Sequence, residues 1–561
     1  MPTSLLKRLQ ITAVVAVCAC ARSPAPTPTP PVAVVDALAV LNNDEAAMRP
    51  WLRDRLLANA MLPSGTDPVS LRRTADGVIV VGRRGQSWLI HDNIVSTVDG
   101  LEDASPAGAA HLHRLERRID VTFHDRLSSV TFEGALFALL VRADDDGVTL
   151  FVAGLEDAPL DRSGGSFGNI DSFLFRVRVD GDGVHRVWSR NLSEAGVVMP
   201  KALAFVGDDL VVVGAGNGTI AVVDDHSGGV RDVVDGLVGG TDLVVVGGRQ
   251  LAVVSPIADA VAFIDLDTGA RRLVPIVDPQ SPRADDLARL GEVLVFSTAL
   301  APEQRSDGPL SRFTCEACHT DGGIDGRVHA TGRFDDGAEV LASTRPLFGL
   351  FQNPPLFSRG IDKSVAVMVH AEVGVANANS PRSPWTPLVV DLEAPFVRDV
   401  VASVADVVDP LTQRRAMLRF FATFGVPRDP TPHDVHPGVA RGQRLFAQHC
   451  QRCHQARVFT DDIDSVVDPA LHPGAVVWAS AEHFDVGVRP LVHPDGARPA
   501  SLRGVRHKRP LLTNGAATDL VDLVGRLRID GSWIKHDGDR SVGKRFDDDE
   551  AADLVSFLQT L

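Results

Sequence analysis

The chain has 561 residues and a formal net charge of -16, and hydrophobic residues make up 44% of it. This length and apolar content predict several folded domains and exclude a disordered protein. The excess of acidic residues argues against a nucleic-acid-binding protein, which needs a basic face to contact phosphates. Tyr is absent, which excludes any mechanism that needs a Tyr ligand or a Tyr radical.

The N-terminus has the features of an export signal. A positively charged start is followed by an apolar run over residues 9–19 that is too short to cross a bilayer. The run ends in VCAC, which resembles a bacterial lipobox with Cys20 as the lipidated residue. We expect a lipoprotein signal peptide over 1–19, a Pro-rich tether over 20–35, and an exported protein that faces the periplasm and is held in the membrane by its lipid anchor only. An ordinary secretory signal cut near Ala21 is the alternative.

Four further cysteines form two CxxCH sequences, which have the spacing of c-type haem attachment. Two thiols three positions apart can each bond a haem vinyl group, and the His that follows is placed to ligate the iron. Disulfides would not require a His after each pair, and zinc sites usually have other spacings. The sequence therefore predicts two covalently bound haem c groups, attached through Cys315, Cys318, Cys450 and Cys453, with His319 and His454 as iron ligands.

The region before the first motif has the pattern of short β-strands. After a helical pattern over 36–60, Val-rich runs broken by Gly and Asp continue to residue 282. At spacings of 44 and 41 residues, three of these runs end in Asp180, Asp224 and Asp265. A period of about 40–45 residues is typical of β-propeller blades. We expect lead-in helices and a β-propeller over 36–282, with an irregular β-sandwich as the alternative.

Two helical units follow, and each contains one CxxCH motif. Helical patterns over 283–296 and 411–424 enclose the first motif, and the chain ends in a helical pattern over 547–561. We therefore expect two mainly α-helical cytochrome c domains, over 283–425 and 430–561. The expected fold class is multidomain, with an all-β propeller followed by two helical domains.

Several sequence features of the helical units point to one family. Each unit opens with an Ala-Arg…Gly…Phe helix, and the first motif continues as CHTDGGIDG. In the second unit PASLRGV is followed by RPLLTNG. Over about residues 283–561, the chain resembles the tandem cytochrome c domains of bacterial di-haem cytochrome c peroxidases and MauG-like proteins. A propeller ahead of the pair resembles fused versions of the same family.

The resemblance implies one haem that relays electrons and a second haem that meets hydrogen peroxide. It also implies a redox partner protein such as a small cytochrome c or a cupredoxin. Peroxidase members commonly carry a His or Met in the loop near the distal haem face. This chain departs from that pattern, because the corresponding positions are Phe357-Ser358-Arg359 and Leu512-Thr513-Asn514.

The sixth ligand of the first haem is predicted from the same resemblance. Family members with an electron-transfer haem often place a Met on the helix after this loop, and Met368 fits that place. A Met ligand raises the haem potential, which suits an electron relay. His370 and His329 are competing ligands, and a plain core role for Met368 is the alternative.

The second haem has no Met available, because no Met follows Met417. Its sixth position is a His, water or nothing, and the candidates are His507 and His536, followed by His472, His483 and His493. A calcium ion between the units is a further expectation, with Asp321 and Asp325 as oxygen ligands and solvated turn residues as the alternative.

These observations favour an exported di-haem c-type cytochrome that transfers electrons. One alternative is a di-haem peroxidase or MauG-like oxidoreductase that reduces hydrogen peroxide at the second haem. Another is a haem-containing lipoprotein that senses redox state or docks a partner. No catalytic residue can be assigned, and the propeller is expected to be a docking or scaffolding surface.

Overall fold

A computed structural model gives the fold of the chain, and the residues that it describes are 38–48, 68–74, 77–82, 87–91, 94–97, 110–124, 126–157, 170–276, 285–302, 312, 314–333, 339–352, 356, 364–376, 387–424, 437–454, 502, 505–512, 515–531, 533–536 and 543–561. The predicted signal peptide, Cys20 and the Pro-rich tether lie outside these residues. Within them, no helix has both the length and the apolar character needed to span a membrane.

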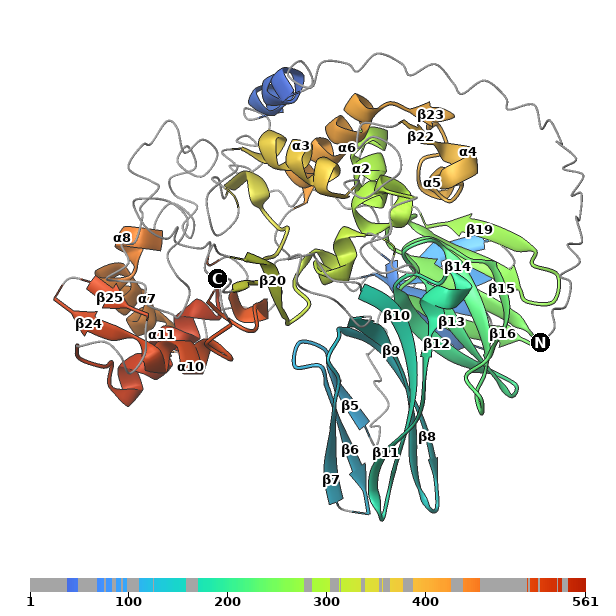
Figure 1. The fold of residues 1–561 in the computed structure, drawn as a ribbon, viewed down its shortest axis with the longest axis horizontal. Helices are drawn as coiled ribbons and strands as arrows, with labels where there is room; N and C mark the ends of the chain where they lie inside the picture. Colours follow the sequence, from blue (N-terminus) through green and yellow to red (C-terminus); the bar gives the residue numbers. More distant parts are fainter. Residues whose placement is uncertain are drawn as a thin grey trace, which may run out of the picture.

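The N-terminal half of the described chain is mostly antiparallel β-sheet (Figure 1). Four sheets have four strands each, arranged in chain order. They contain β1 (Pro68–Thr74), β2 (Gly77–Gly82), β3 (Ser87–His91) and β4 (Ile94–Thr97); β8 (Leu136–Asp144), β9 (Gly147–Asp157), β10 (Ile170–Asp180) and β11 (Gly183–Asn191); β12 (Pro200–Val206), β13 (Asp209–Gly214), β14 (Thr219–Asp224) and β15 (Val230–Asp235); and β16 (Asp242–Gly247), β17 (Gln250–Ser255), β18 (Ala260–Asp265) and β19 (Arg271–Pro275). A fifth sheet has three strands, β5 (Ala110–His113), β6 (Arg118–Phe123) and β7 (Arg126–Thr131).

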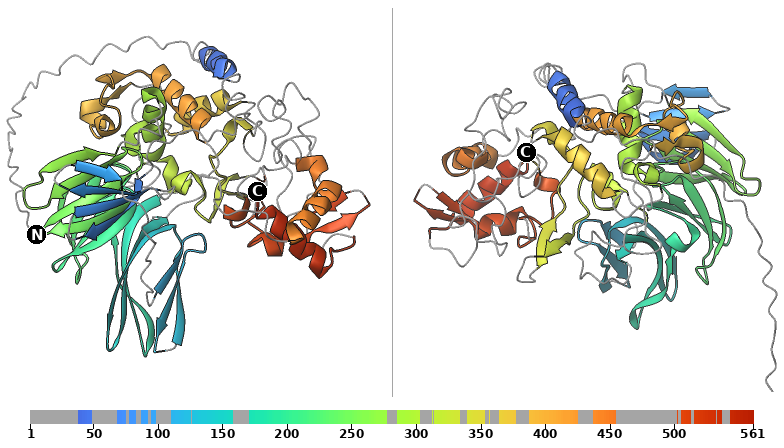
Figure 2. Two further views of the ribbon diagram at one scale, coloured as in Figure 1. Left: turned by 180° about the vertical axis from the view of Figure 1, so that it is seen from behind. Right: turned by 45° about the horizontal axis from the view of Figure 1, so that its top comes forward.

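The first strands of the four-stranded sheets lie next to one another. β8 contacts β12, β12 contacts β16, and β16 contacts β1. The first sheet of the chain therefore lies beside the last, as it does when successive blades close toward a ring. The three-stranded sheet packs instead against β9, β10 and β11, and these long strands extend away from the rest of the molecule (Figures 1 and 2). This arrangement is consistent with a propeller-like domain.

Each Asp of the sequence repeat ends the third strand of a sheet and organises the turn after it. Asp224 ends β14, and its Oδ1 accepts hydrogen bonds from the backbone N–H and the hydroxyl of Ser227, at 2.7 and 2.8 Å. Asp265 ends β18 and accepts the same pair of bonds from Thr268, at 3.0 and 2.9 Å. Asp180 ends β10 in the same position. Such local bonds from an Asp side chain favour a turn over a longer strand.

The first helical unit follows the sheets. Its helices are α2 (Asp286–Phe296), α3 (Val365–Ala376), α4 (Val390–Glu393), α5 (Val397–Val400) and α6 (Pro410–Thr423). Short strands accompany them, namely β20 (Val328–Arg333), β21 (Glu339–Ser343), β22 (Leu388–Val389) and β23 (Val407–Val408). The second unit contains α7 (Pro437–His449), α8 (Gln451–His454), α10 (Leu520–Arg526), β24 (Arg528–Asp530), β25 (Trp533–Lys535) and α11 (Asp548–Leu558).

Helices α2 and α6 of the first unit cross in close contact at a glycine. A Cβ atom on Gly291 would lie 2.0 Å from the carbonyl oxygen of Ala416 and 2.7 Å from Cβ of Phe420. Only a residue without a side chain lets the two backbones approach this closely. The ring of Phe296, at the end of α2, lies 5.7 Å from the ring of Phe420 and covers the crossing.

Helices α7 and α11 of the second unit repeat this crossing. A Cβ atom on Gly442 would lie 2.0 Å from the carbonyl oxygen of Asp553 and 2.8 Å from Cβ of Phe557. The rings of Phe446 and Phe557 lie 5.3 Å apart. In both units, therefore, a glycine on the first helix contacts a backbone carbonyl on the last helix. The phenylalanine four residues after that carbonyl, on the same last helix, packs beside the glycine.

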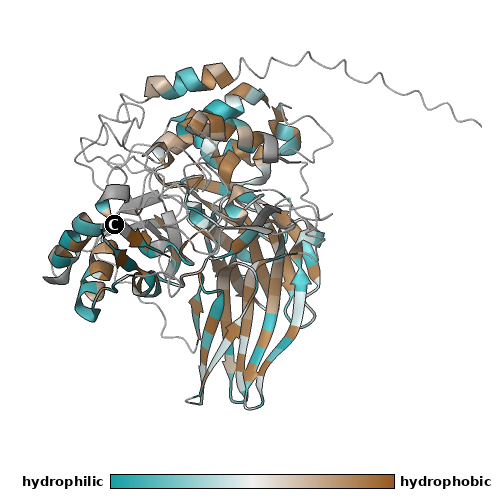
Figure 3. Ribbon diagram, turned by 60° about the vertical axis from the view of Figure 1, so that its left-hand side comes forward, coloured by the Kyte–Doolittle hydropathy of each residue, from teal (hydrophilic) through white to brown (hydrophobic). Residues whose placement is uncertain are grey.

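The hydrophobic cores group the residues differently from the domains that the sequence predicts. One continuous core joins strand residues such as Val213 and Val253 to helix residues such as Val293 and Met417. The apolar core of the second unit, over residues 439–561, is separate from it. In Figure 3 apolar residues run through the sheets and the helices above them. The propeller-like region and the first helical unit thus share one core.

The helix over 38–48 lies on the helical side of this core. Glu45 accepts a hydrogen bond from the backbone N–H of Ala366, at the start of α3, at 2.7 Å. Asp44 pairs with Arg415 of α6 at 2.6 Å. The sequence prediction grouped this segment with the sheets, but these contacts bind it to α3 and α6.

Candidate haem-attachment sites

The first motif forms a tight turn that carries both of its cysteines. It begins as the 3-10 helix η4 (Cys315–Ala317), which Thr314 caps by accepting a hydrogen bond from the N–H of Glu316 at 3.3 Å. The N–H of His319 then bonds the carbonyl oxygen of Cys315 at 2.9 Å. This local folding places two thiols and one imidazole on a single turn, as the spacing predicts.

Burial sets the protonation of two groups at this turn. Burial raises the pKa of the Cys315 thiol to about 12, so the thiol is protonated. Burial lowers the pKa of His319, which keeps its imidazole neutral, and a neutral imidazole is the form that ligates iron. Cys315 also packs against the continuous hydrophobic core. Two cysteines on one turn and a neutral imidazole, with Cys315 beside an apolar cluster, therefore fit a covalent haem.

Met368, the predicted sixth ligand, lies on α3 and is 6% exposed. It belongs to the same core against which Cys315 packs, so the structure brings the methionine and the first motif to one apolar region. His370 lies two residues further along α3, where burial and the neighbouring charge of Arg414 lower its pKa. Both sequence candidates on this helix are thus retained.

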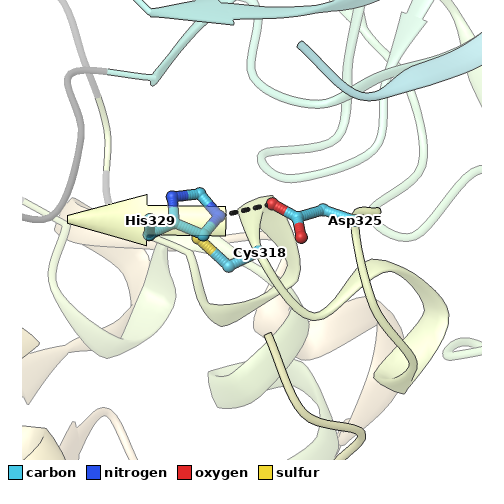
Figure 4. A group of neighbouring side chains, drawn as sticks. All are labelled: Cys318, Asp325 and His329. Atoms are coloured by element: carbon cyan, nitrogen blue, oxygen red, sulfur yellow. Dashed lines mark hydrogen bonds and ion pairs between the residues drawn. The ribbon is translucent and has the colours of Figure 1, made fainter. Parts of the chain in front are cut away.

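His329 forms a cluster with the second cysteine of the motif. Its Nε2 lies 2.6 Å from Oδ2 of Asp325, and the ligand atoms of Cys318, Asp325 and His329 all lie within 4.8 Å of one another (Figure 4). Burial alone would lower the pKa of His329, but Asp325 and Cys318 outweigh burial and raise it to about 10. The carboxylate of Asp325 therefore engages Nε2 of His329.

The two carboxylates considered for calcium already have cationic partners. Asp325 bonds His329, and its Oδ1 accepts the N–H of Arg327 at 3.1 Å. Asp321 lies 2.7 Å from Nζ of Lys201, on strand β12. The two side chains are engaged separately, so this geometry gives no support to a calcium site.

The second motif begins where helix α7 ends. The N–H of Cys450 bonds the carbonyl oxygen of Phe446 at 2.8 Å, and the N–H of His454 bonds that of Cys450 at 3.2 Å. Cys450 packs against the core of the second unit, and the ring of His454 lies 6.4 Å from that of Phe446. The side chain of Cys453 lies outside the described part of the structure.

The candidates for the sixth ligand of the second haem are only partly described. His507 ends the 3-10 helix η10 (Val505–His507), and His536 directly follows β25. The other ligand candidates, His472, His483 and His493, lie outside the described residues. Of the loop positions that depart from the peroxidase pattern, the structure describes only Leu512. The remaining positions, which also lie outside the described residues, are Phe357, Ser358, Arg359, Thr513 and Asn514.

The sequence model of the cytochrome c family matches residues 439–561, which include the second motif. The C-terminal unit is a cytochrome c domain. A domain of this family carries covalently bound haem c with its iron, and this supports a haem-based role in electron transfer. No curated protein matches the chain.

Solved structures that resemble the chain cover little more than a third of it. Glutaminyl cyclase from Myxococcus xanthus is 12% identical over 37% of this chain and 69% of its own, with a TM-score of 0.18. The nidogen/laminin complex is 16% identical over 38% and 82%, with a TM-score of 0.21. The β-propeller domain of Cps50 (Swd1) from Myceliophteria thermophila is 13% identical over 36% and 65%, with a TM-score of 0.22. Scores this low carry no argument about function.

One residue of the first site has no counterpart in the sequence prediction. Lys201 lies on β12, and its ammonium group bonds Glu316, the residue directly after Cys315. The attraction of Asp321 and Glu316 outweighs the desolvation of the lysine and raises its pKa. The feature of the sequence that could have indicated Lys201 is its position as the one charged residue in the otherwise apolar run VVMPKALAFV.

Proposed function

We propose that the protein is an exported di-haem c-type cytochrome that transfers electrons, with one haem at each CxxCH motif. The observation that carries this proposal is the helix crossing that both units share. The C-terminal unit is a cytochrome c domain, and Gly291, Ala416 and Phe420 of the first unit repeat the contacts of Gly442, Asp553 and Phe557. In each unit a CxxCH motif also lies between the two crossing helices in the sequence. The first cysteine of each motif packs against an apolar core.

Haem counting tests this proposal. In the purified full chain, covalent haem should amount to two groups per polypeptide after denaturation. The variant Cys315→Ala/Cys318→Ala should retain one haem, and Cys450→Ala/Cys453→Ala should also retain one. If the wild-type chain carries one covalent haem, and the variant without Cys315 and Cys318 also carries one, the di-haem proposal is contradicted and only the C-terminal haem remains.

Within this function, each part of the chain has a defined task. The bound iron supplies reversible one-electron chemistry. His319 offers an imidazole that burial keeps neutral, His454 offers the imidazole of the second motif, and Met368 offers a soft thioether from a buried position. The apolar cores around the cysteines exclude water, which limits the reorganisation that accompanies electron transfer. The proposed partner is a small cytochrome c or a cupredoxin.

A second candidate function is reduction of hydrogen peroxide at the second haem. It is favoured by the absence of any methionine after Met417, which leaves histidine, water or an open position at that iron. Optical and EPR spectra of the half-reduced protein test it. A high-spin signal that disappears when peroxide is added supports a peroxidase, whereas two low-spin haems that do not respond to peroxide support electron transfer alone.

Export and lipid anchoring are part of the proposal. They rest on the charged start, the short apolar run and the VCAC sequence of the leader. Cys20→Ser should abolish labelling by a radioactive fatty acid and release the protein from the membrane fraction. Unlabelled wild-type protein would contradict the anchor and favour the ordinary secretory signal.

A further inference from the structure

The two residues between the cysteines of the first motif both contact the propeller-like region. The carboxylate of Glu316 is 3% exposed and bonds the ammonium group of Lys201, which is 8% exposed. Ala317 packs against an apolar cluster of strand and loop residues, formed by Ala135, Phe137, Leu155, Val198, Met199 and Ala215. The turn that carries the thiols is therefore covered on this side by the sheets.

The charges at this contact are balanced across the two parts of the chain. Asp321, two residues after His319, lies 2.7 Å from Nζ of Lys201 and 3.7 Å from Arg114. Its own N–H bonds Oε1 of Glu316 at 3.3 Å. Two cations from the sheets thus face two carboxylates from the motif. Since a buried carboxylate is costly without a partner, Glu316 depends on Lys201.

A second contact holds the loop that follows the motif. Gly326 has φ of +73°, and a Cβ atom there would lie 2.2 Å from the carbonyl oxygen of Leu115, in the turn between β5 and β6. Arg117 of the same turn donates a hydrogen bond to the carbonyl oxygen of Gly326. Arg327 pairs with Asp157, at the end of β9, at 2.6 Å. The loop is therefore bound to two different sheets.

We infer that the propeller-like region is an integral part of the first haem site, and that Lys201 is the positioning residue through which it acts. Lys201 holds the turn of Cys315 and Cys318 in place through Glu316, and its positive charge raises the reduction potential of the haem bound there. The inference rests on the proposed function, because it requires a haem at the first motif. It assigns the sheets a role in building a redox centre.

Two substitutions separate the charge effect from a loss of structure. A nearby positive charge favours the reduced haem, which carries one positive charge fewer than the oxidised haem. Lys201→Met should therefore lower the potential of the first haem, and Glu316→Gln should raise it. Mere loosening of the turn would admit water in both variants, and would shift both potentials in the same direction.

The experiment uses the full chain in the Cys450→Ala/Cys453→Ala background, so that only the first haem is titrated. Potentiometric titration gives its potential, and mass spectrometry of haem-bearing peptides from the otherwise native chain gives its occupancy. Lys201→Met should also lower the occupancy of the first motif at least several-fold, while Lys201→Arg, which keeps the charge, should restore both occupancy and potential.

The outcomes distinguish this inference from the proposed function. If Cys315→Ala/Cys318→Ala leaves the haem count of the chain unchanged, the first motif holds no haem and the proposed function fails. If that variant loses one haem, but Lys201→Met and Glu316→Gln leave the potential unchanged or move it in the same direction, the first haem exists and the role of Lys201 is overturned.

Discussion

Among single residues, Met368 is the proposed sixth ligand of the proposed first haem. It lies in the core that Cys315 contacts, and a thioether ligand would stabilise the reduced iron. Met368→Leu keeps the size and apolar character of the side chain, so the fold should be retained. We expect the variant to lose the absorption band of a thioether–iron bond and to show a lower first-haem potential, measured by optical spectroscopy during a redox titration.

A matched variant is available in the same core. Met417 on α6 is 1% exposed and belongs to the same cluster as Met368. Met417→Leu should leave the absorption band and the potential unchanged, because the proposed ligand is untouched. A band that survives in Met368→Leu would show that its thioether comes from another methionine, and a wild-type chain without the band would show that another residue, such as His370, ligates the iron.

At the scale of the element, the crossing of α7 and α11 depends on Gly442. Replacing a glycine inside a helix by alanine usually stabilises the helix by roughly 0.5–1 kcal/mol. At Gly442 the new methyl group would lie 2.0 Å from the carbonyl oxygen of Asp553, so the helices must separate. Gly442→Ala should instead lower the free energy of unfolding of the C-terminal domain by roughly 1–3 kcal/mol, as overpacked cores do.

Gly525 on α10 provides the control for this prediction. A Cβ atom on Gly525 would meet nothing within 4 Å, so Gly525→Ala should be neutral or stabilising. Urea unfolding of both variants, followed by the haem absorption of the second unit, measures the difference. If Gly442→Ala and Gly525→Ala are equally stable, the two helices of the crossing move apart without a cost in free energy, and the prediction is wrong.

The hairpin of β8 and β9 carries a pH-dependent contact with β10. Hydrogen bonds from Arg178, both at 2.6 Å, lower the pKa of Asp144 to about 2. The folded pKa lies below the usual value of 3.8, so the pair stabilises the fold above about pH 4 and loses this effect as the pH falls toward 2. Asp144→Asn should therefore be less stable than wild type at pH 6, with a difference that shrinks as the pH is lowered.

Chemical unfolding between pH 6 and pH 3 measures this difference. Arg178→Leu should give the same pH dependence, because either substitution removes the pair. The double variant should then add little to either single variant. A stability difference that stays constant over this range would assign the effect of the substitution to packing and not to charge.

Local chemistry explains which elements the sequence could predict. The turns after Asp224 and Asp265 were predicted because each Asp bonds groups only three residues away. The turn of the first motif was predicted for the same reason, since Cys315 bonds His319. The bond between Lys201 and Glu316 joins residues 115 positions apart, and no local pattern encodes it. The second ligand of each proposed haem would depend on such distant packing and could not be derived from spacing.

At the scale of the whole molecule, the two helical units differ in how they are supported. The first shares its core with the sheets and with the helix over 38–48, and its motif is covered by Lys201 and Ala135. The second has its own core, built around Phe446 and Phe557. Contacts such as that of Arg509 with Glu116, at 2.9 Å, connect the second unit to the sheets through exposed groups, and exposed ion pairs contribute little to stability.

This difference predicts that the two units behave differently when they are expressed alone. Residues 430–561 should fold as a one-haem cytochrome, because all described residues of their core belong to this segment. Residues 283–425 should remain unfolded and poor in haem, because their half of the shared core would be exposed and Glu316 would lose Lys201. Far-ultraviolet circular dichroism and covalent haem content measure both fragments. A folded, haem-bearing 283–425 fragment would show that the shared core is dispensable and that the first unit, like the second, is an independent domain.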